Sequence, residues 1–231
     1  MGPDFSHRSA EHEIMDGGIG SFELFDQSLK QIETVNRLTL GYRPVLIWLE
    51  RQLSRQSGPV TVLDIGCGRG DLLRRIWRLG ERKQIALRLV GVDIDPWSAP
   101  AARSATPSGM EIDYRTGDAF SLDVASDFIV CSHVTHHMQN QEIVALIRWL
   151  EAHAQHGWFI SDLHRHVIPY FFAKLLLGLA PVNSMVRNDG AVSVARAFTA
   201  QDWREILQEA SVPTQVSWHF PFRYCLRQDK G

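Results

Sequence analysis

The chain has 231 residues, 45% of them hydrophobic, and a formal net charge of -2 at pH 7. This length allows one sizeable core and is short for two, so we expect a single globular domain. Acidic and basic residues are interleaved without a basic stripe, which argues against nucleic acid as a substrate. The three cysteines form no CxxC pair and no secretory signal precedes them, which favours a reducing, cytoplasmic setting.

The N-terminal fifth of the chain divides into two parts. Residues 1–20 are polar and show no sustained apolar period, which predicts a mobile arm. Apolar residues then recur at helical spacing between Phe22 and Gln56, with one break that predicts two helices. We therefore expect the domain over residues 21–231, with residues 21–57 as a helical cap in front of the sheet.

From residue 58 onward, short apolar runs alternate with helical stretches, which is the pattern of βαβ units and a parallel sheet. The order indicates an α/β domain of the doubly wound kind. The expected strands are 60–64, 87–93, 112–116, 127–132, 157–162, 214–218 and 222–226. The expected helices are 71–79, 98–104, 141–154, 169–179 and 199–209.

A glycine-rich turn follows the first expected strand. Gly66, Gly68 and Gly70 lie between that strand and a helix, the order that a nucleotide-binding loop needs. The third glycine comes one residue early for a dinucleotide fingerprint, and Asp71 stands where that fingerprint requires Gly or Ala. Carboxylates at Asp64 and Asp71 would repel a pyrophosphate. A ligand with an ammonium and a sulfonium, such as S-adenosylmethionine, suits this loop better.

The segment from Val62 to Gly70 resembles motif I of the class I S-adenosylmethionine-dependent methyltransferases, of the small-molecule, UbiE-like type. The resemblance extends over residues 58–226. It implies a Rossmann-like, seven-stranded sheet that is mostly parallel and has an antiparallel strand near its C-terminal end. It also implies S-adenosylmethionine as the cofactor.

Further segments resemble later motifs of the same family, and these imply roles for particular residues. Asp93, about 20 residues past the glycines, is expected to hold the ribose hydroxyls, and Asp118 to accept from the adenine amino group. Either acid can instead be a strand end or a turn residue. The full expected cofactor set is Asp64, Gly66, Cys67, Gly68, Gly70, Asp93, Ile94, Asp118, Ala119 and Ser132, with Asn36 and Arg43 from the N-terminal helices.

Histidines follow two strands that should end at the ligand-binding edge of the sheet. His136 and His137 come after the fourth strand, and His164 and His166 after the fifth. A phenol is mostly neutral at pH 7 because its pKa is about 10, and a histidine side chain with a pKa of about 6.5 can take its proton. We predict His164 and His166 as candidate bases, with His136 behind them.

Two other roles for the histidines stay open at this stage. His137 is expected to pack beside the cofactor or at a helix end rather than to act in catalysis. Histidines and Asp162 are also metal-ligand types, but no zinc-type spacing is present, so we expect no metal.

Residues 164–197 are expected to form a lid insertion over the acceptor. The aromatic and leucine-rich run that begins at Val167 either lines an apolar pocket or forms a core or dimer face. The run is interrupted by Lys174 and falls short of the roughly 20 residues that span a bilayer, so we expect no membrane span.

These features together predict O-methylation of a small aromatic or polyketide-like acceptor. The segment from Ser161 to His166 is faintly similar to methyltransferases of bacterial natural-product pathways. Three alternatives remain: methylation of carbon or nitrogen, a nicotinamide-dependent oxidoreductase, and a binding module without turnover. We expect a small apolar or aromatic acceptor as the partner, and a homodimer is compatible with the pattern.

Overall fold

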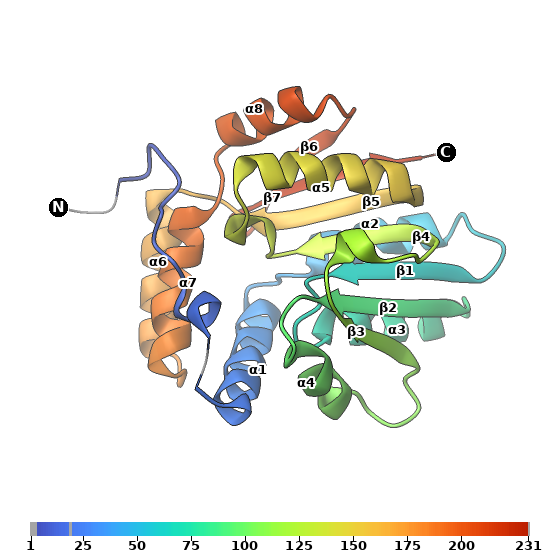
Figure 1. The fold of residues 1–231 in the computed structure, drawn as a ribbon, viewed down its shortest axis with the longest axis horizontal. Helices are drawn as coiled ribbons and strands as arrows, with labels where there is room; N and C mark the ends of the chain where they lie inside the picture. Colours follow the sequence, from blue (N-terminus) through green and yellow to red (C-terminus); the bar gives the residue numbers. More distant parts are fainter. Residues whose placement is uncertain (1–3, 19, 231) are drawn as a thin grey trace.

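The computed structural model describes residues 4–18 and 20–230. Its centre is a seven-stranded sheet with the order β3-β2-β1-β4-β5-β7-β6 (Figure 1). The strands are β1 (Val60–Ile65), β2 (Leu87–Asp93), β3 (Ile112–Thr116), β4 (Ser126–Ser132), β5 (Ala154–Leu163), β6 (Gln215–His219) and β7 (Arg223–Asp229).

The first five strands are parallel, and β7 pairs antiparallel with both β5 and β6. This confirms the predicted Rossmann-like class. Strand order reverses between β1 and β4, and the carboxyl ends of these two strands therefore mark the usual ligand-binding edge of such a sheet.

Helices cover both faces of the sheet because the central strands are apolar on both sides. One face packs α5 (Asn140–His153) and α8 (Ala200–Ala210) around Trp158 and Trp203. The other face packs the remaining sheet helices around Trp48, whose ring lies 5.7 Å from that of Phe128. These remaining helices are α2 (Arg43–Leu53), α3 (Asp71–Lys83) and α4 (Ser98–Ala105).

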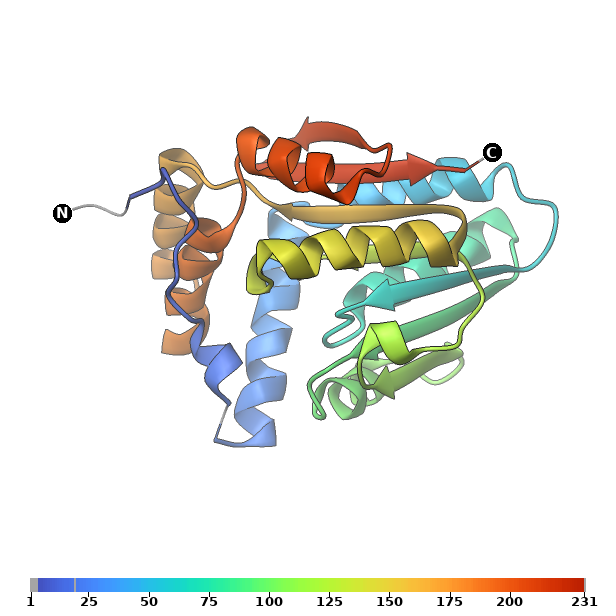
Figure 2. The same ribbon diagram turned by 45° about the horizontal axis from the view of Figure 1, so that its top comes forward.

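Three further helices stand at one end of the sheet, where Figures 1 and 2 show them as a separate layer. They are α1 (Phe22–Leu38), α6 (Val167–Leu179) and α7 (Ser184–Arg196). The sequence predicted a lid over residues 164–197, which contains α6 and α7, but it did not predict that α7 is a helix. Its sequence carries no apolar stripe because residues on most sides of α7 are buried, among them Val186, Asp189 and Val194.

The N-terminal arm differs from its expectation. Residues 4–18 lie along α7 in the structure and include a short helix, η1 (Ile14–Gly17) (Figure 1). The backbone N–H of Ser9 donates to Ala195 at 3.0 Å, and the Asp189 carboxylate accepts from the N–H of Ile14 at 2.9 Å. Polar contacts of this kind leave no apolar period in the sequence, which is why the pattern predicted mobility. Residues 1–3 and 19 of the predicted arm lie outside the described residues.

Among the described residues, no helix has the length and apolar character needed to cross a bilayer.

Candidate active site

The glycine loop makes a cradle at the carboxyl end of β1. Gly68 has a φ of +49°, a region that favours glycine, and its N–H donates to the Asp93 carboxylate at 2.8 Å. A Cβ on Gly68 would meet only a Leu29 side-chain carbon at 3.9 Å, so this side of the loop faces open space. A Cβ on Gly66 would collide with Val134. The loop is therefore open at Gly68 and packed at Gly66 against the segment that carries His136.

Three carboxylates surround this cradle, and two of them, Asp64 and Asp71, are buried. Burial raises the pKa of Asp64 well above its ordinary value, and the charges of Asp71 and Asp93 raise it further. Burial also raises the pKa of Asp71 to about 6 and that of Asp93. Within the described chain, Asp71 Oδ2 has no hydrogen-bond partner. Because carboxylates packed this closely destabilise one another, they favour a cationic ligand.

Asn36, one of the two N-terminal residues predicted to contact the cofactor, is connected to this group. Its amide donates to the Tyr42 hydroxyl at 3.0 Å, and that hydroxyl donates to Asp71 Oδ1, also at 3.0 Å. The other, Arg43, is exposed in a groove between α2 and α3 that Arg75 and Arg78 also line. The structure therefore connects Asn36, but not Arg43, to the acids of the glycine loop by hydrogen bonds.

The later cofactor candidates lie where successive parallel strands end. Asp118 follows β3 and accepts from the N–H of Phe120 at 3.0 Å, so it caps a helical turn that includes the buried Ala119. Ser132 ends β4, and among the described residues its hydroxyl has no partner. Ile94 is 79% exposed and Cys67 is buried. Asp93, Asp118 and Ser132 thus share one edge of the sheet with the glycine loop.

A cavity of about 200 Å³ lies beside this edge, between α1, α6 and α7. Its walls are mainly apolar, and its polar side chains come from the N-terminal arm, α1 and its C-terminal end, α7, the segment after β4 and, through Arg223, β7. Residues that line it include Glu13, Val35, Asn36, Thr39, His133, His136, His137, Leu163, Pro169, Phe172, Ala173, Leu176, Leu177, Val186, Ser193 and Phe222.

His136 is held firmly at this cavity. Its Nδ1 lies 2.7 Å from Asp162 Oδ1, and its backbone N–H donates to the other carboxylate oxygen at 3.0 Å. Asp162 is fully buried at the end of β5. Burial alone would raise the pKa of Asp162, but the His136 imidazole and the hydrogen bonds from His136 and Thr135 hold it well below its ordinary value. The charged carboxylate fixes the ring of His136 and directs Nε2 away from the strand.

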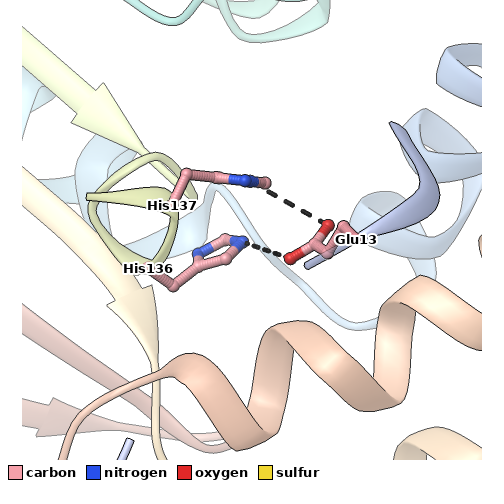
Figure 3. A group of neighbouring side chains, drawn as sticks. All are labelled: Glu13, His136 and His137. Carbon is pink, nitrogen blue, oxygen red and sulfur yellow. Dashed lines mark ion pairs between the residues drawn. The ribbon is translucent and has the colours of Figure 1, made fainter. Parts of the chain in front are cut away.

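Glu13, from the N-terminal arm, faces both histidines that follow β4 (Figure 3). Its carboxylate lies 3.5 Å from Nε2 of His136 and 4.0 Å from Nε2 of His137. Burial raises the pKa of Glu13 to about 7. The other ring nitrogen of His137, Nδ1, lies 2.9 Å from Asp16 Oδ1. Sequence reasoning missed Glu13, because an isolated acid in a polar arm carries no signal of burial.

These three side chains are also of metal-ligand type, and one candidate atom from each lies within 4.8 Å of the others. The sequence-based expectation of no metal considered the histidines and Asp162, but not Glu13. Nε2 of His136 and the Glu13 carboxylate face each other at 3.5 Å in this group.

His164 and His166 are not among the residues that line the cavity, although the neighbouring Leu163 is. His164 Nδ1 accepts from the Trp218 indole at 3.3 Å, and its ring packs against Tyr224. His166 accepts from the N–H of Ile168 and so caps α6. The structure brings these two histidines together, with ring centroids 5.5 Å apart, but not with His136. Their predicted catalytic role stays a prediction, and their placement favours a role in holding α6.

Comparison with known proteins identifies the cofactor edge. Residues 62–157, which contain β1, the glycine loop, Asp93, Asp118 and His136, match the family profile described as a methyltransferase domain. Residues 62–157 thus form a methyltransferase domain of the class I S-adenosylmethionine-dependent kind.

The similarity to individual proteins agrees with this assignment. The methyltransferase is 29% identical over 183 residues to a ubiquinone biosynthesis O-methyltransferase of Methylocella silvestris, covering 73% of this chain and 68% of that protein. It is 39% identical over 108 residues to a ribosomal protein L11 methyltransferase of Dechloromonas aromatica, covering 40% of this chain but only 33% of that protein.

Among solved structures, the fold is similar to magnesium protoporphyrin IX methyltransferase from Synechocystis PCC 6803 with bound S-adenosylhomocysteine. The TM-score is 0.56 at 21% identity, and the match covers 93% of this chain and 90% of that one. S-adenosylmethionine is the cofactor of the methyltransferase. The residues fit it, because the buried acids favour its positive charges and Gly68 leaves space for close approach.

The raised pKa of buried Glu13 predicts that the free energy of unfolding depends on pH. Its pKa rises from an ordinary 4.5 to about 7 on folding, so the folded methyltransferase holds an extra proton between these pH values. The free energy of unfolding should therefore fall as pH rises through this window, by about 3 kcal/mol at most. Glu13→Gln removes this titration, and urea unfolding at pH 5 and pH 8 measures the difference. Equal pH dependence in both proteins would contradict the prediction.

Proposed function

We propose that the methyltransferase methylates a hydroxyl oxygen of a small, largely apolar acceptor bound in the cavity. The observation that carries this proposal is the Asp162–His136 pair at a mainly apolar cavity, where Nε2 of His136 lies 3.5 Å from the Glu13 carboxylate. Packing of Val134 on Gly66 links the two sites, because Val134 lies only two residues before His136. The acceptor and cofactor are thus expected to meet at this segment.

His136 is the proposed general base. Asp162 accepts a hydrogen bond from Nδ1–H and stays ionised, which leaves the lone pair on Nε2 for the acceptor hydroxyl. The O–H bond breaks as the proton moves to Nε2, and the charge of Asp162 stabilises the resulting imidazolium. Glu13, 3.5 Å from Nε2, is positioned to receive that proton next.

The rest of the chain positions the reactants. Bound S-adenosylmethionine supplies an electrophilic methyl group on its sulfonium. Gly68, Asp93 and Asp118 are proposed to hold its nucleoside part, with Asp64 and Asp71 at the charged part. The apolar walls from α6 and α7 exclude water and orient the acceptor oxygen, which is what an in-line displacement requires of a protein.

The relatives leave the acceptor atom open, so the site has to decide between the alternatives. One similar protein is named as an O-methyltransferase and another as acting on a ribosomal protein. Methylation of carbon or nitrogen does not require a positioned base to the same extent, and a binding module requires none. The buried Asp162–His136 pair therefore favours a hydroxyl acceptor.

An acceptor panel tests the proposal. The purified methyltransferase is incubated with S-adenosylmethionine and small phenols, with the corresponding anilines and methyl ethers as matched compounds, and products are detected by mass spectrometry. We expect turnover of phenols only. Ala173→Trp, which fills the cavity from α6, should abolish this turnover and leave S-adenosylhomocysteine affinity unchanged. Turnover of anilines alone, or full activity in Ala173→Trp, would refute the proposal.

A further inference from the structure

The outer face of α6 is an unusually apolar surface. Ile168, Phe171, Leu175 and Leu179 are between 55% and 80% exposed, and their spacing places them along one side of the helix. The opposite side of α6 lines the cavity through residues such as Ala173. A single helix thus separates solvent from the acceptor cavity.

The end of β6 and the turn that joins it to β7, together called the β6–β7 turn, continue this surface. Trp218 is 47% exposed and Phe220 is 69% exposed. The ring of Phe222 lies 5.6 Å from that of Phe172 on α6 and 6.5 Å from those of Trp218 and Phe220. Aromatic and aliphatic side chains from two elements therefore form one patch, and exposed patches of this kind mark interaction sites.

The two segments that carry the patch contain no acidic side chain. No Asp or Glu occurs from residue 163 to 188 or from 210 to 228. The exposed charged side chains in the first of these segments are Lys174 and Arg187. A second copy docked face to face would bring these cations together without an acid from either segment to pair with them. An anionic lipid surface supplies both an apolar layer and the complementary charge.

We propose that this patch, formed by α6 and the β6–β7 turn, docks on an anionic lipid bilayer. The helix has 13 residues and is suited to lie in the interface, with the tryptophan at the headgroup level. The inference rests on the proposed function in one respect: it assigns to the cavity a lipid-soluble hydroxyl acceptor, which enters past α6 from the membrane.

Vesicle binding tests this inference. The full chain is sedimented with two kinds of vesicle, one of pure phosphatidylcholine and one that also contains about 30% phosphatidylglycerol. Each is tested at about 0.1 M and about 0.5 M salt. We expect binding to the anionic vesicles that weakens at high salt. Leu175→Ser/Leu179→Ser should weaken it about tenfold or more, because each leucine loses apolar burial. Leu38→Ser/Ile47→Ser, which changes exposed apolar residues on α1 and α2, is the matched control and should bind normally.

The outcomes separate this inference from the proposed function. Absence of vesicle binding, or equal loss in the control variant, would overturn the docking surface. A dimer in vesicle-free light scattering that Leu175→Ser/Leu179→Ser dissociates would overturn it as well, because the patch would then bind a second copy. Turnover of a short, water-soluble phenol should be unchanged in Leu175→Ser/Leu179→Ser, and it reports on the proposed function alone.

Discussion

His136→Gln should lower kcat by about 10²- to 10⁴-fold, the range that a positioned general base contributes. The cause is loss of the proton-accepting nitrogen at the cavity, while Asp162 keeps a hydrogen-bond donor next to it. Affinity for S-adenosylhomocysteine should stay within about threefold of the original, since His136 is not among the expected cofactor contacts. Steady-state kinetics with a phenol from the acceptor panel, together with calorimetry, measures both effects.

His164→Gln is the matched control for this prediction, because it removes a histidine at the neighbouring strand end that lies outside the cavity lining. Its kcat should remain within a few-fold of the original. A large loss of kcat in His164→Gln with little effect in His136→Gln would reverse the assignment and restore the base that the sequence pattern ranked first.

Asp93→Ala should weaken the binding of S-adenosylhomocysteine by about 100-fold. The substitution removes the carboxylate expected to hold the ribose, and hydrogen bonds to a charged group contribute about 1.5–3 kcal/mol each. It also removes the acceptor that orients Gly68 N–H, so the cradle loses part of its shape. Isothermal calorimetry measures the affinity directly.

Asp113→Ala serves as the control for Asp93→Ala. Asp113 is an exposed acid on the adjacent strand β3 and pairs only with Arg115 among the described residues. The Asp113→Ala protein should bind S-adenosylhomocysteine with the affinity of the parent protein. Neither variant nor the parent protein should bind NAD. An unchanged affinity in Asp93→Ala would show that another residue holds the ribose.

The sheet and the glycine loop could be predicted because both depend on local pattern. Apolar runs of strand length with turn residues between them predicted five of the seven strands to within one residue at each end. The structure extends β5 at its N-terminal end and β7 at its C-terminal end. The helix α8 begins one residue after the expected position, with a capping box between Thr199 and Asp202. Local rules apply there because each element buries a regular face.

The acceptor side could not be predicted in the same way. Its key pair joins Asp162 to His136 across two neighbouring strand ends, and sequence order alone did not rank His136 above His164. Glu13 reaches the cavity through backbone contacts of the arm with α7, a helix whose own pattern is masked by burial on several sides. Contacts that depend on tertiary placement leave no periodic signal.

The central claim is that a methyl group moves to an acceptor oxygen in the cavity next to His136. Transfer from S-adenosylmethionine labelled with carbon-13 at its methyl group, followed by NMR of the isolated product, tests this most directly. We expect a labelled aryl methyl ether that the parent protein forms and that His136→Gln forms at a strongly reduced rate. A label on carbon or nitrogen, or an unchanged rate in His136→Gln, would contradict it.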